Sequence, residues 1–127
     1  MTRMEDCQVL RATVEPHYNC CQSILVPFAK EMGMTEAQAY ALGAHFGSGM
    51  RHGSTCGAVT GALMALGLLG CGAEESNAFL KAFREQEGDL TCANLLAIGK
   101  EKDLEKKPHC TQLVAAAAAL VDELSRT

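Results

Sequence analysis

The sequence has no basic cluster, and this argues against a nucleic-acid partner. Its 127 residues include 15 acidic and 11 basic side chains, which give a formal net charge of -4 at pH 7. The one charge-dense stretch, Lys100 to Lys107, mixes both signs. Nucleic-acid binding rests on attraction between basic side chains and phosphates. We therefore expect no nucleic-acid partner.

A secretory signal is also missing from the first 18 residues. They contain no apolar core segment and carry charges at Arg3, Glu5, Asp6, Arg11 and Glu15. A signal peptide needs an apolar segment of about 7–15 residues. We therefore expect a cytoplasmic protein.

The familiar spacings of cysteine sites are absent, although the chain contains seven cysteines. There is no Cys-x-x-Cys knuckle, and the absence of Cys-x-x-Cys-His excludes covalent c-type haem. No Gly-Lys-Ser/Thr follows a strand, so a phosphate-binding loop is not expected. In a reducing compartment, thiols suit metal binding, redox chemistry or burial better than a disulfide framework.

A long uncharged stretch, Gly53 to Ala73, raises the question of a transmembrane helix. A span needs about 20 predominantly apolar residues. Glycine recurs through the stretch, and only Ala62 to Leu69 is strongly apolar. We expect a buried central helix here rather than a membrane span.

The remaining pattern predicts an all-α protein, a single helical domain over residues 1–127. Six or seven helices are expected to pack around a glycine-rich central helix at Thr55 to Leu69. The apolar positions near the C-terminus recur with helical period. They are Leu113, Val114, Ala117, Leu120, Val121 and Leu124.

Start and stop signals place several of these helices. Asn19 with Gln22 and Thr35 with Gln38 have the spacing of capping boxes, and they open helices over Cys20 to Met32 and up to Phe46. Pro27 is expected to kink the first of these two helices. A shorter first helix is expected to end before Pro16, and Gly88 to end a helix that contains Phe79 and Phe83.

Four cysteines share one local position, in the first turn of a predicted helix. Asn19, Thr55 and Thr91 are good N-cap residues that precede Cys20, Cys56 and Cys92, and Pro108 opens the helix that contains Cys110. Each of the four also begins the apolar stripe of its helix, so all four thiols are expected to point inward. The alternative is that they are small hydrophobic side chains in the core. Neighbours on a helix point about 100° apart, so we expect Cys20 rather than Cys21 to face the site.

A helix start favours the thiolate form of a cysteine, which is both the nucleophile and the metal ligand. If the four helix starts meet, they form a site for thiolates, metal ions or a transient disulfide. Cys7 and Cys71 lack this context and are expected to pack in the core.

Histidines and glycines lie near the same cysteines in the sequence. His17, His52 and His109 flank them, and such imidazoles can take a thiol proton, stabilise a thiolate or bind a metal. Glycine inside a helix lowers its stability, so the presence of Gly57 and Gly61 requires an explanation. Close approach of another backbone, or of a cofactor bulkier than a side chain, supplies one.

These residues resemble a family of redox-active proteins named for a C_GCAxxG_C_C pattern of four separated cysteines. The similarity runs over Asn19-Cys20-Cys21-Gln22, the segment Phe46 to Leu63, Cys92 and Cys110. It implies a small protein of thiol or iron-sulfur redox function, often associated with transport systems. Here the central motif reads Cys-Gly-Ala-x-x-Gly instead of Gly-Cys-Ala, and Cys21 is an additional thiol.

The leading hypothesis is a redox protein in which the four cysteines converge. They would bind an iron-sulfur cluster as ligands, or cycle between dithiol and disulfide; zinc, or no cofactor at all, is the other option. Gly57 and Gly61 would lie beside a cofactor. The candidate partners are a redox protein, a membrane transport system and a second copy of the chain. Whether the chain is an enzyme stays open.

The rival hypothesis is a non-catalytic helical interaction module with packed or zinc-bound cysteines. Within the redox hypothesis, Cys56 is expected to be the most reactive thiol and to act with Cys20 and His52. Arg51 and His52 precede it in a glycine-rich loop, whereas Cys92 has acidic neighbours in the sequence.

Overall fold

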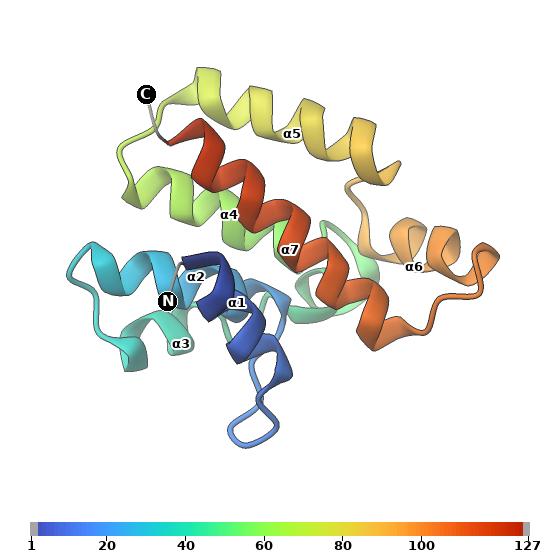
Figure 1. Cartoon of the computed structure of the whole chain (residues 1–127), viewed down its shortest axis with the longest axis horizontal. Coiled ribbons are helices and arrows are strands. Elements are labelled where there is room, and N and C mark those ends of the chain that lie inside the picture. The colour runs from blue at the N-terminus through green and yellow to red at the C-terminus, as the bar shows by residue number, and fades with distance from the viewer. Residues whose placement is uncertain (1–2, 126–127) are drawn as a thin grey trace.

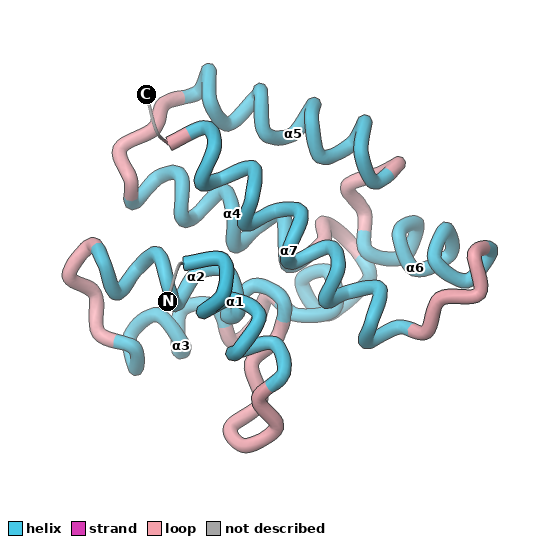
Figure 2. Tube along the Cα trace, viewed as in Figure 1, coloured by secondary structure: helices cyan, strands magenta, loops and turns pink. Residues whose placement is uncertain are grey.

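The computed structural model describes residues 3–125, and regular structure in this range is entirely helical (Figure 1). The elements are α1 (Arg3–Ala12), α2 (Cys20–Glu31), α3 (Glu36–Gly43), η1 (Gly49–Gly53), α4 (Gly57–Leu68), α5 (Ala73–Glu87), α6 (Cys92–Glu101) and α7 (Lys106–Leu124). No strand occurs in the described range (Figure 2). The expected all-α class is therefore confirmed.

The structure differs from the expected helix count in one element. Seven α-helices lie within residues 3–125, and the short segment η1 is an additional π-helical turn with irregular dihedral angles. None of these helices combines the length and the hydropathy that crossing a bilayer requires. In particular, α4, within the uncharged stretch, has 12 residues.

Both capping boxes predicted from the sequence are confirmed. The Asn19 side chain accepts a hydrogen bond from the Gln22 backbone, and the Gln22 side chain accepts one from the Asn19 backbone, each at 2.8 Å. Thr35 and Gln38 make the same pair of bonds at the start of α3. Because such bonds satisfy the free N–H groups of a first turn, these two helices begin where the sequence indicates.

Helix α3 ends at Gly43 rather than at Phe46. The Asn19 side chain donates a hydrogen bond of 3.1 Å to the Gly43 carbonyl, which gives this end of the helix a partner from outside α3. A terminal carbonyl bonded to another side chain no longer needs a further helical turn. The same asparagine therefore begins α2 and holds the end of α3.

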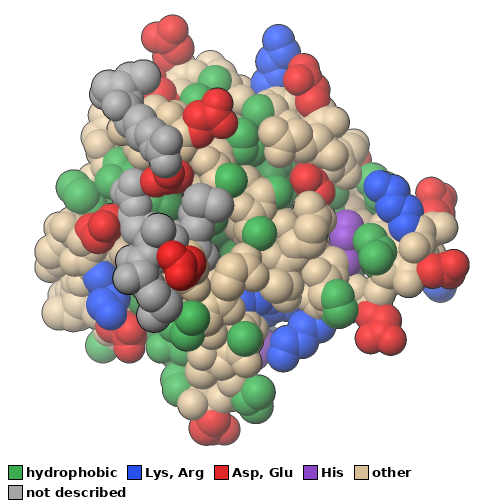
Figure 3. All heavy atoms as spheres, viewed as in Figure 1, with side chains coloured by type: hydrophobic (Ala, Val, Ile, Leu, Met, Phe, Trp, Pro, Cys, Tyr) green, Lys and Arg blue, Asp and Glu red, His purple; other side chains and the backbone are tan. Residues whose placement is uncertain are grey.

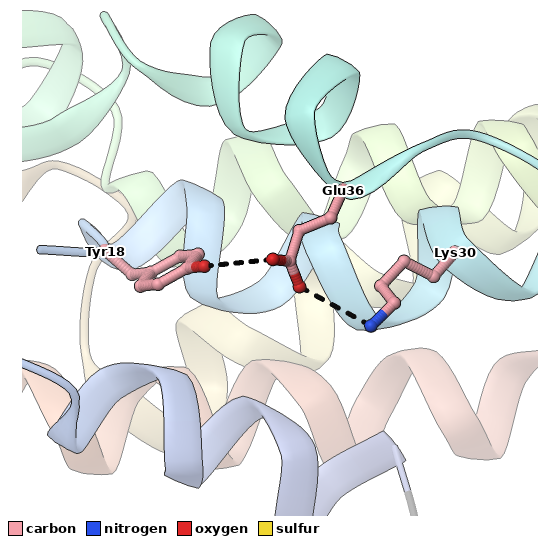
Figure 4. A network of polar contacts seen from close by, with 3 residues as sticks. All are labelled: Tyr18, Lys30 and Glu36. Atoms are coloured by element: carbon pink, nitrogen blue, oxygen red, sulfur yellow. Dashed lines mark hydrogen bonds and ion pairs between the residues drawn. The ribbon is translucent and has the colours of Figure 1, made fainter. Parts of the chain in front are cut away.

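Two polar contacts join the start of α3 to residues near the two ends of α2 (Figure 4). Glu36 accepts a hydrogen bond of 3.5 Å from the Tyr18 hydroxyl and forms an ion pair of 3.4 Å with Lys30. Lys30 and Glu36 are both solvent-exposed, so the ion pair itself contributes little stability. The two contacts fix how α3 lies beside α2.

The expected start of the last helix is wrong by two residues. Helix α7 begins at Lys106, so Pro108 is its third residue rather than its first. Proline is tolerated throughout the first turn because the N–H groups there have no helical partner. Cys110 consequently lies just beyond the first turn.

The core is built where α4 meets α2, α5 and α7. Its largest buried side chains are Phe28, Phe79, Phe83, Leu66 and Leu113. In Figure 1, α7 runs diagonally across the molecule, with α5 along one side and α4 behind it. This packing brings the N-terminal ends of α2, α4, α6 and α7 toward one region.

The two glycines of α4 allow α2 to approach closely. A Cβ atom at Gly61 would lie 2.8 Å from the Cys21 carbonyl oxygen, and one at Gly57 would lie 3.1 Å from the Cys21 backbone nitrogen. Side chains at these positions would force the two helices apart. Close backbone approach, the first of the two reasons considered for these glycines, is therefore confirmed.

Candidate functional site

Four cysteines from four different helix starts line one cavity of about 150 Å³. They are Cys20, Cys56, Cys92 and Cys110. We call this space the thiol cavity. The structure thus brings together the four residues that share a local position in the sequence, although successive members lie far apart along the chain.

A short backbone pairing places Cys56 beside Cys92. Thr55 and Thr91 form an isolated antiparallel bridge immediately before α4 and α6. The Cys56 N–H donates to the Leu90 carbonyl at 2.8 Å, and the Cys92 N–H donates to the Ser54 carbonyl at 2.7 Å. Because one bridge ties both helix starts, the two thiols enter the cavity from neighbouring positions.

The loop before Cys56 packs against this bridge through Gly49. Gly49 has a φ of +63°, and a Cβ atom there would lie 2.5 Å from both the Cys92 Cβ and the Ser54 carbonyl oxygen. Its own carbonyl accepts a hydrogen bond of 2.8 Å from the Ser54 N–H. Glycine is therefore required by both the dihedral angle and the available space.

On the other side of the cavity, Gly57 brings Cys20 against the start of α4. A Cβ atom at Gly57 would lie 3.1 Å from the Cys20 Cβ. Gly57 lines the thiol cavity, whereas Gly61 is buried against Cys21 and is not among the lining residues. Of the two glycines expected beside a cofactor, the structure brings only Gly57 to the cavity.

Cys110 is held by a tight contact between α6 and α7. The buried His109 ring lies 3.0 Å, through Nε2, from the Leu95 carbonyl oxygen. A Cβ atom at Gly99 would lie 2.6 Å from the His109 ring, so this glycine lets the two helices meet. The histidine fixes α7 against α6, and Cys110 follows it into the cavity.

Arg11 is a cavity residue that the sequence analysis missed. Its side chain is 8% exposed, lines the thiol cavity and donates a hydrogen bond of 3.4 Å to the Tyr18 carbonyl. Arg11 lies one helical turn after Cys7 in α1. An arginine on the buried stripe of a predicted helix was the available signal, because charged residues are rarely buried without a function or a partner.

The most acidic thiol of the cavity is Cys110. A hydrogen bond from the Cys20 thiol lowers the pKa of Cys110 to about 6, and Arg11, His109 and Lys106 act in the same direction. The hydrogen bond and burial raise the pKa of Cys20 well above its ordinary value. The pKa of Cys110 is thus lowered and that of Cys20 raised, which favours the thiolate form at Cys110.

The pKa of Cys56 differs from the expectation that its helix start would favour the thiolate and make it the most reactive thiol. Burial raises its pKa to about 11, and the backbone N–H groups of Ala58 and Val59 offset this only in part. Cys56 is the residue before α4, not its first residue as predicted. Burial also raises the pKa of Cys92, with Cys110 adding to the rise and Lys106 opposing it.

The cationic neighbours expected for Cys56 lie elsewhere. Arg51 and His52 belong to η1, are exposed, and do not line the thiol cavity. His17 does line the cavity, from its exposed rim. The structure thus brings His17 to the thiols and places His52 outside.

The three remaining cysteines do not line the cavity. Cys7 and Cys21 are fully buried, and Cys21 contacts the Met64 sulfur at 4.0 Å. Cys71 is half-buried and packs against the core. Their positions agree with the packing role expected for each.

The four cavity thiols are not arranged as a metal site. Within the described part of the chain, no group of three or more His, Cys, Asp or Glu side chains has the geometry to hold a metal ion. An iron-sulfur cluster or a structural zinc needs about four such ligands around one centre. The described donor set thus offers no site for a single metal ion, and the iron-sulfur cluster stays a prediction.

Comparisons with known proteins identify the family. The family described as "Putative redox-active protein (C_GCAxxG_C_C)" matches residues 18–124, which include all four cavity cysteines. No curated protein and no solved structure matches the chain. Since the match covers most of the sequence, the chain belongs to the C_GCAxxG_C_C family of redox-active proteins.

Proposed function

We propose that this protein is a thiol-disulfide redox protein whose reactive pair is Cys110 and Cys20. The observation that carries the proposal is that Cys20 and Cys110 line the same small cavity, close enough for each thiol to shift the pKa of the other. Two thiols that face one small cavity from neighbouring helices can form a bond without a large movement of the chain. One of them is also held as a thiolate at neutral pH, which is the form that attacks.

The chemistry follows the exchange of thiols with a disulfide. The Cys110 thiolate attacks one sulfur of a disulfide, breaks its S–S bond and releases the first leaving group as a thiolate. Cys20 then loses its proton to that released thiolate, or to water, and attacks Cys110. The Cys20–Cys110 disulfide forms, the second half of the substrate leaves, and two electrons have passed from the protein to the substrate.

The basic neighbours of Cys110 support this division of roles. Cys110 lies near the start of α7 among three basic side chains, which stabilise its charge. Cys20 stays protonated while Cys110 is a thiolate, so the two do not compete for the first attack. Cys56 and Cys92 also line the cavity, and burial raises the pKa of both thiols.

Mapping the disulfide tests the proposal. The fully reduced protein is treated anaerobically with one equivalent of bis(2-hydroxyethyl) disulfide, the remaining thiols are blocked, and the peptides are analysed by mass spectrometry. We expect a Cys20–Cys110 disulfide, and in Cys20→Ser a trapped mixed disulfide on Cys110. A Cys56–Cys92 disulfide instead would contradict the assignment of the pair.

Two controls separate the proposal from its alternatives. Cys21→Ser changes the neighbouring residue, which does not line the cavity, and should oxidise like the natural protein. If the Ser variants of Cys20 and Cys110 changed stability but not oxidation, the interaction module would replace the redox proposal. Stoichiometric iron and sulfide in anaerobically purified protein would favour a cluster, and zinc alone a structural site.

A further inference from the structure

Apart from the Cys110 thiol, the ionisable side chains on the rim and wall of the thiol cavity include three basic groups. Arg11, His17 and Lys106 line it, and no aspartate or glutamate of the described residues does. The chain as a whole carries more acidic than basic side chains. A cavity that gathers basic groups in an acidic protein has a local field that attracts anions.

The guanidinium of Arg11 has an N–H donor that no group of the described protein accepts from. Its side chain is more than nine-tenths buried, and its Nε atom has no hydrogen-bond partner within the protein. Among residues 3–125, it donates one hydrogen bond, from an Nη atom to the Tyr18 carbonyl, which is long at 3.4 Å. A guanidinium carries five N–H donors in a fork that matches a carboxylate, and leaving them unpaired inside a protein costs stability.

The basic residues also lie around the reactive thiol at two depths. Lys106 precedes Cys110 by four residues on α7, so both lie on the same face of that helix. Lys106 and His17 are exposed at the rim of the cavity, while Arg11 and Cys110 are buried. On the face shown in Figure 3, basic side chains gather between α1 and the start of α7. A small anion entering past Lys106 would meet Arg11 and Cys110 together.

We propose that the thiol cavity receives a low-molecular-weight disulfide that carries a carboxylate group, with Arg11 and Lys106 binding the carboxylate while Cys110 attacks the adjacent sulfur. This inference rests on the proposed thiol-disulfide function and adds the substrate class. The S–S bond of the substrate breaks, its two halves leave as thiols or thiolates, and the electrons come from the Cys20 and Cys110 thiols. The cavity volume of about 150 Å³ suits such a molecule rather than a folded partner.

Three disulfides of similar size and different charge test the inference. Dithiodiglycolate is anionic, bis(2-hydroxyethyl) disulfide is neutral and cystamine is cationic. For each disulfide, the rate constant of its reaction with Cys110 is divided by the rate constant of its reaction with the thiolate of 2-mercaptoethanol. This ratio corrects for the intrinsic reactivity of the disulfide. We expect the anionic disulfide to exceed the neutral one by about tenfold, and the cationic one to be slowest. Added KCl should reduce this preference.

Variants assign the preference to the two basic residues. Arg11→Gln should abolish the preference for the anion, and Lys106→Gln should reduce it by about two- to fivefold. The matched controls are Lys107→Gln and Arg51→Gln, which remove exposed charges outside the cavity and should leave the ratio unchanged. Because Lys106 is exposed, its variant keeps the test open even if Arg11→Gln fails to fold.

The outcomes separate this inference from the function on which it rests. Equal corrected rates for all three disulfides would overturn the anionic substrate and leave the Cys110–Cys20 pair standing. A preference that survives in both variants would overturn the assignment to Arg11 and Lys106. If Cys110 reacts with none of the disulfides, both the proposed function and the substrate class fall.

Discussion

The two sides of the thiol cavity show how one fold gives the same side chain opposite properties. On the α4 side, backbone packs against backbone, and burial holds Cys56 as a neutral thiol. On the α7 side, Cys110 meets a hydrogen-bond donor and basic side chains, which hold it as a thiolate. Both cysteines are buried to a similar degree, 4% and 7% exposed. At Cys110 the partners outweigh the effect of burial on the pKa, whereas at Cys56 burial outweighs the backbone N–H groups.

The largest expected effect is a difference in alkylation rate between the two sides. At pH 7, Cys110 is mostly ionised and Cys56 hardly at all, while the lower intrinsic nucleophilicity of an acidic thiolate offsets part of this gap. We expect Cys110 to react roughly 30- to 100-fold faster with limiting iodoacetamide. Peptide mass spectrometry locates the label. Cys110→Ser should remove the fast phase and Cys56→Ser should leave it, and the reverse result would invert the comparison.

The close packing on the α4 side is tested by two glycines of the same helix. Gly61→Ala should lower the free energy of unfolding by about 2 kcal/mol, because its Cβ atom would press on the Cys21 backbone. Gly67→Ala is the matched control, since a Cβ atom there meets nothing within 4 Å. It should raise the free energy of unfolding by about 0.5–1 kcal/mol through helix propensity. Urea unfolding of both variants under reducing conditions measures the difference, and equal effects would refute the packing argument.

The α7 side depends on the hydrogen bond from Cys20. Cys20→Ala removes the donor, so the pKa of Cys110 should rise and its alkylation at pH 6.5 should slow by about tenfold. Cys20→Ser keeps an O–H donor and serves as the control. If the alanine variant reacted as fast as the serine variant, the hydrogen bond would not be the main cause of the acidity of Cys110.

A smaller effect is expected in the pH dependence of stability. The pKa of Cys110 is about 6 in the folded protein, below its value in the unfolded chain. Its ionisation therefore stabilises the folded protein at alkaline pH, and this stabilisation is lost as the pH falls through 6. The pKa of Cys56 is about 11, above its unfolded value, so its contribution is present at neutral pH and is lost as the pH rises through 11. Between pH 6 and 9, the free energy of unfolding of the natural protein should rise by on the order of 1 kcal/mol relative to that of Cys110→Ser. Urea unfolding with a non-thiol reductant measures this gain, and a flat difference would contradict it.

Local signals in the sequence were enough to predict much of the fold. The two capping boxes are readable because a cap depends on residues three apart, and Asn19 and Thr35 begin their helices as expected. The shared helix-start position of four cysteines also pointed to the residues that line the cavity. The start of α7 was misplaced because proline fits several positions of a first turn.

The acidity of the site could not be read from the sequence. Arg51 and His52 precede Cys56 along the chain and predict it as the most reactive thiol, but their side chains are exposed and outside the cavity. The groups that act on Cys110 include Arg11 and Cys20, which come from helices about 90 or more residues away in the sequence. Such contacts arise from the packing of α1 and α2 on α7, and the spacing of residues along the sequence does not predict them.

The central claim is that Cys110 is a thiolate at neutral pH with Cys20 as its partner, and a pH titration of thiolate absorbance tests it most directly. The ultraviolet difference between the reduced natural protein and Cys110→Ser is followed from pH 4 to pH 10. The account predicts one thiolate appearing with a midpoint near pH 6, absent from the variant. A midpoint at the ordinary cysteine value of about 8.5 or above would contradict it.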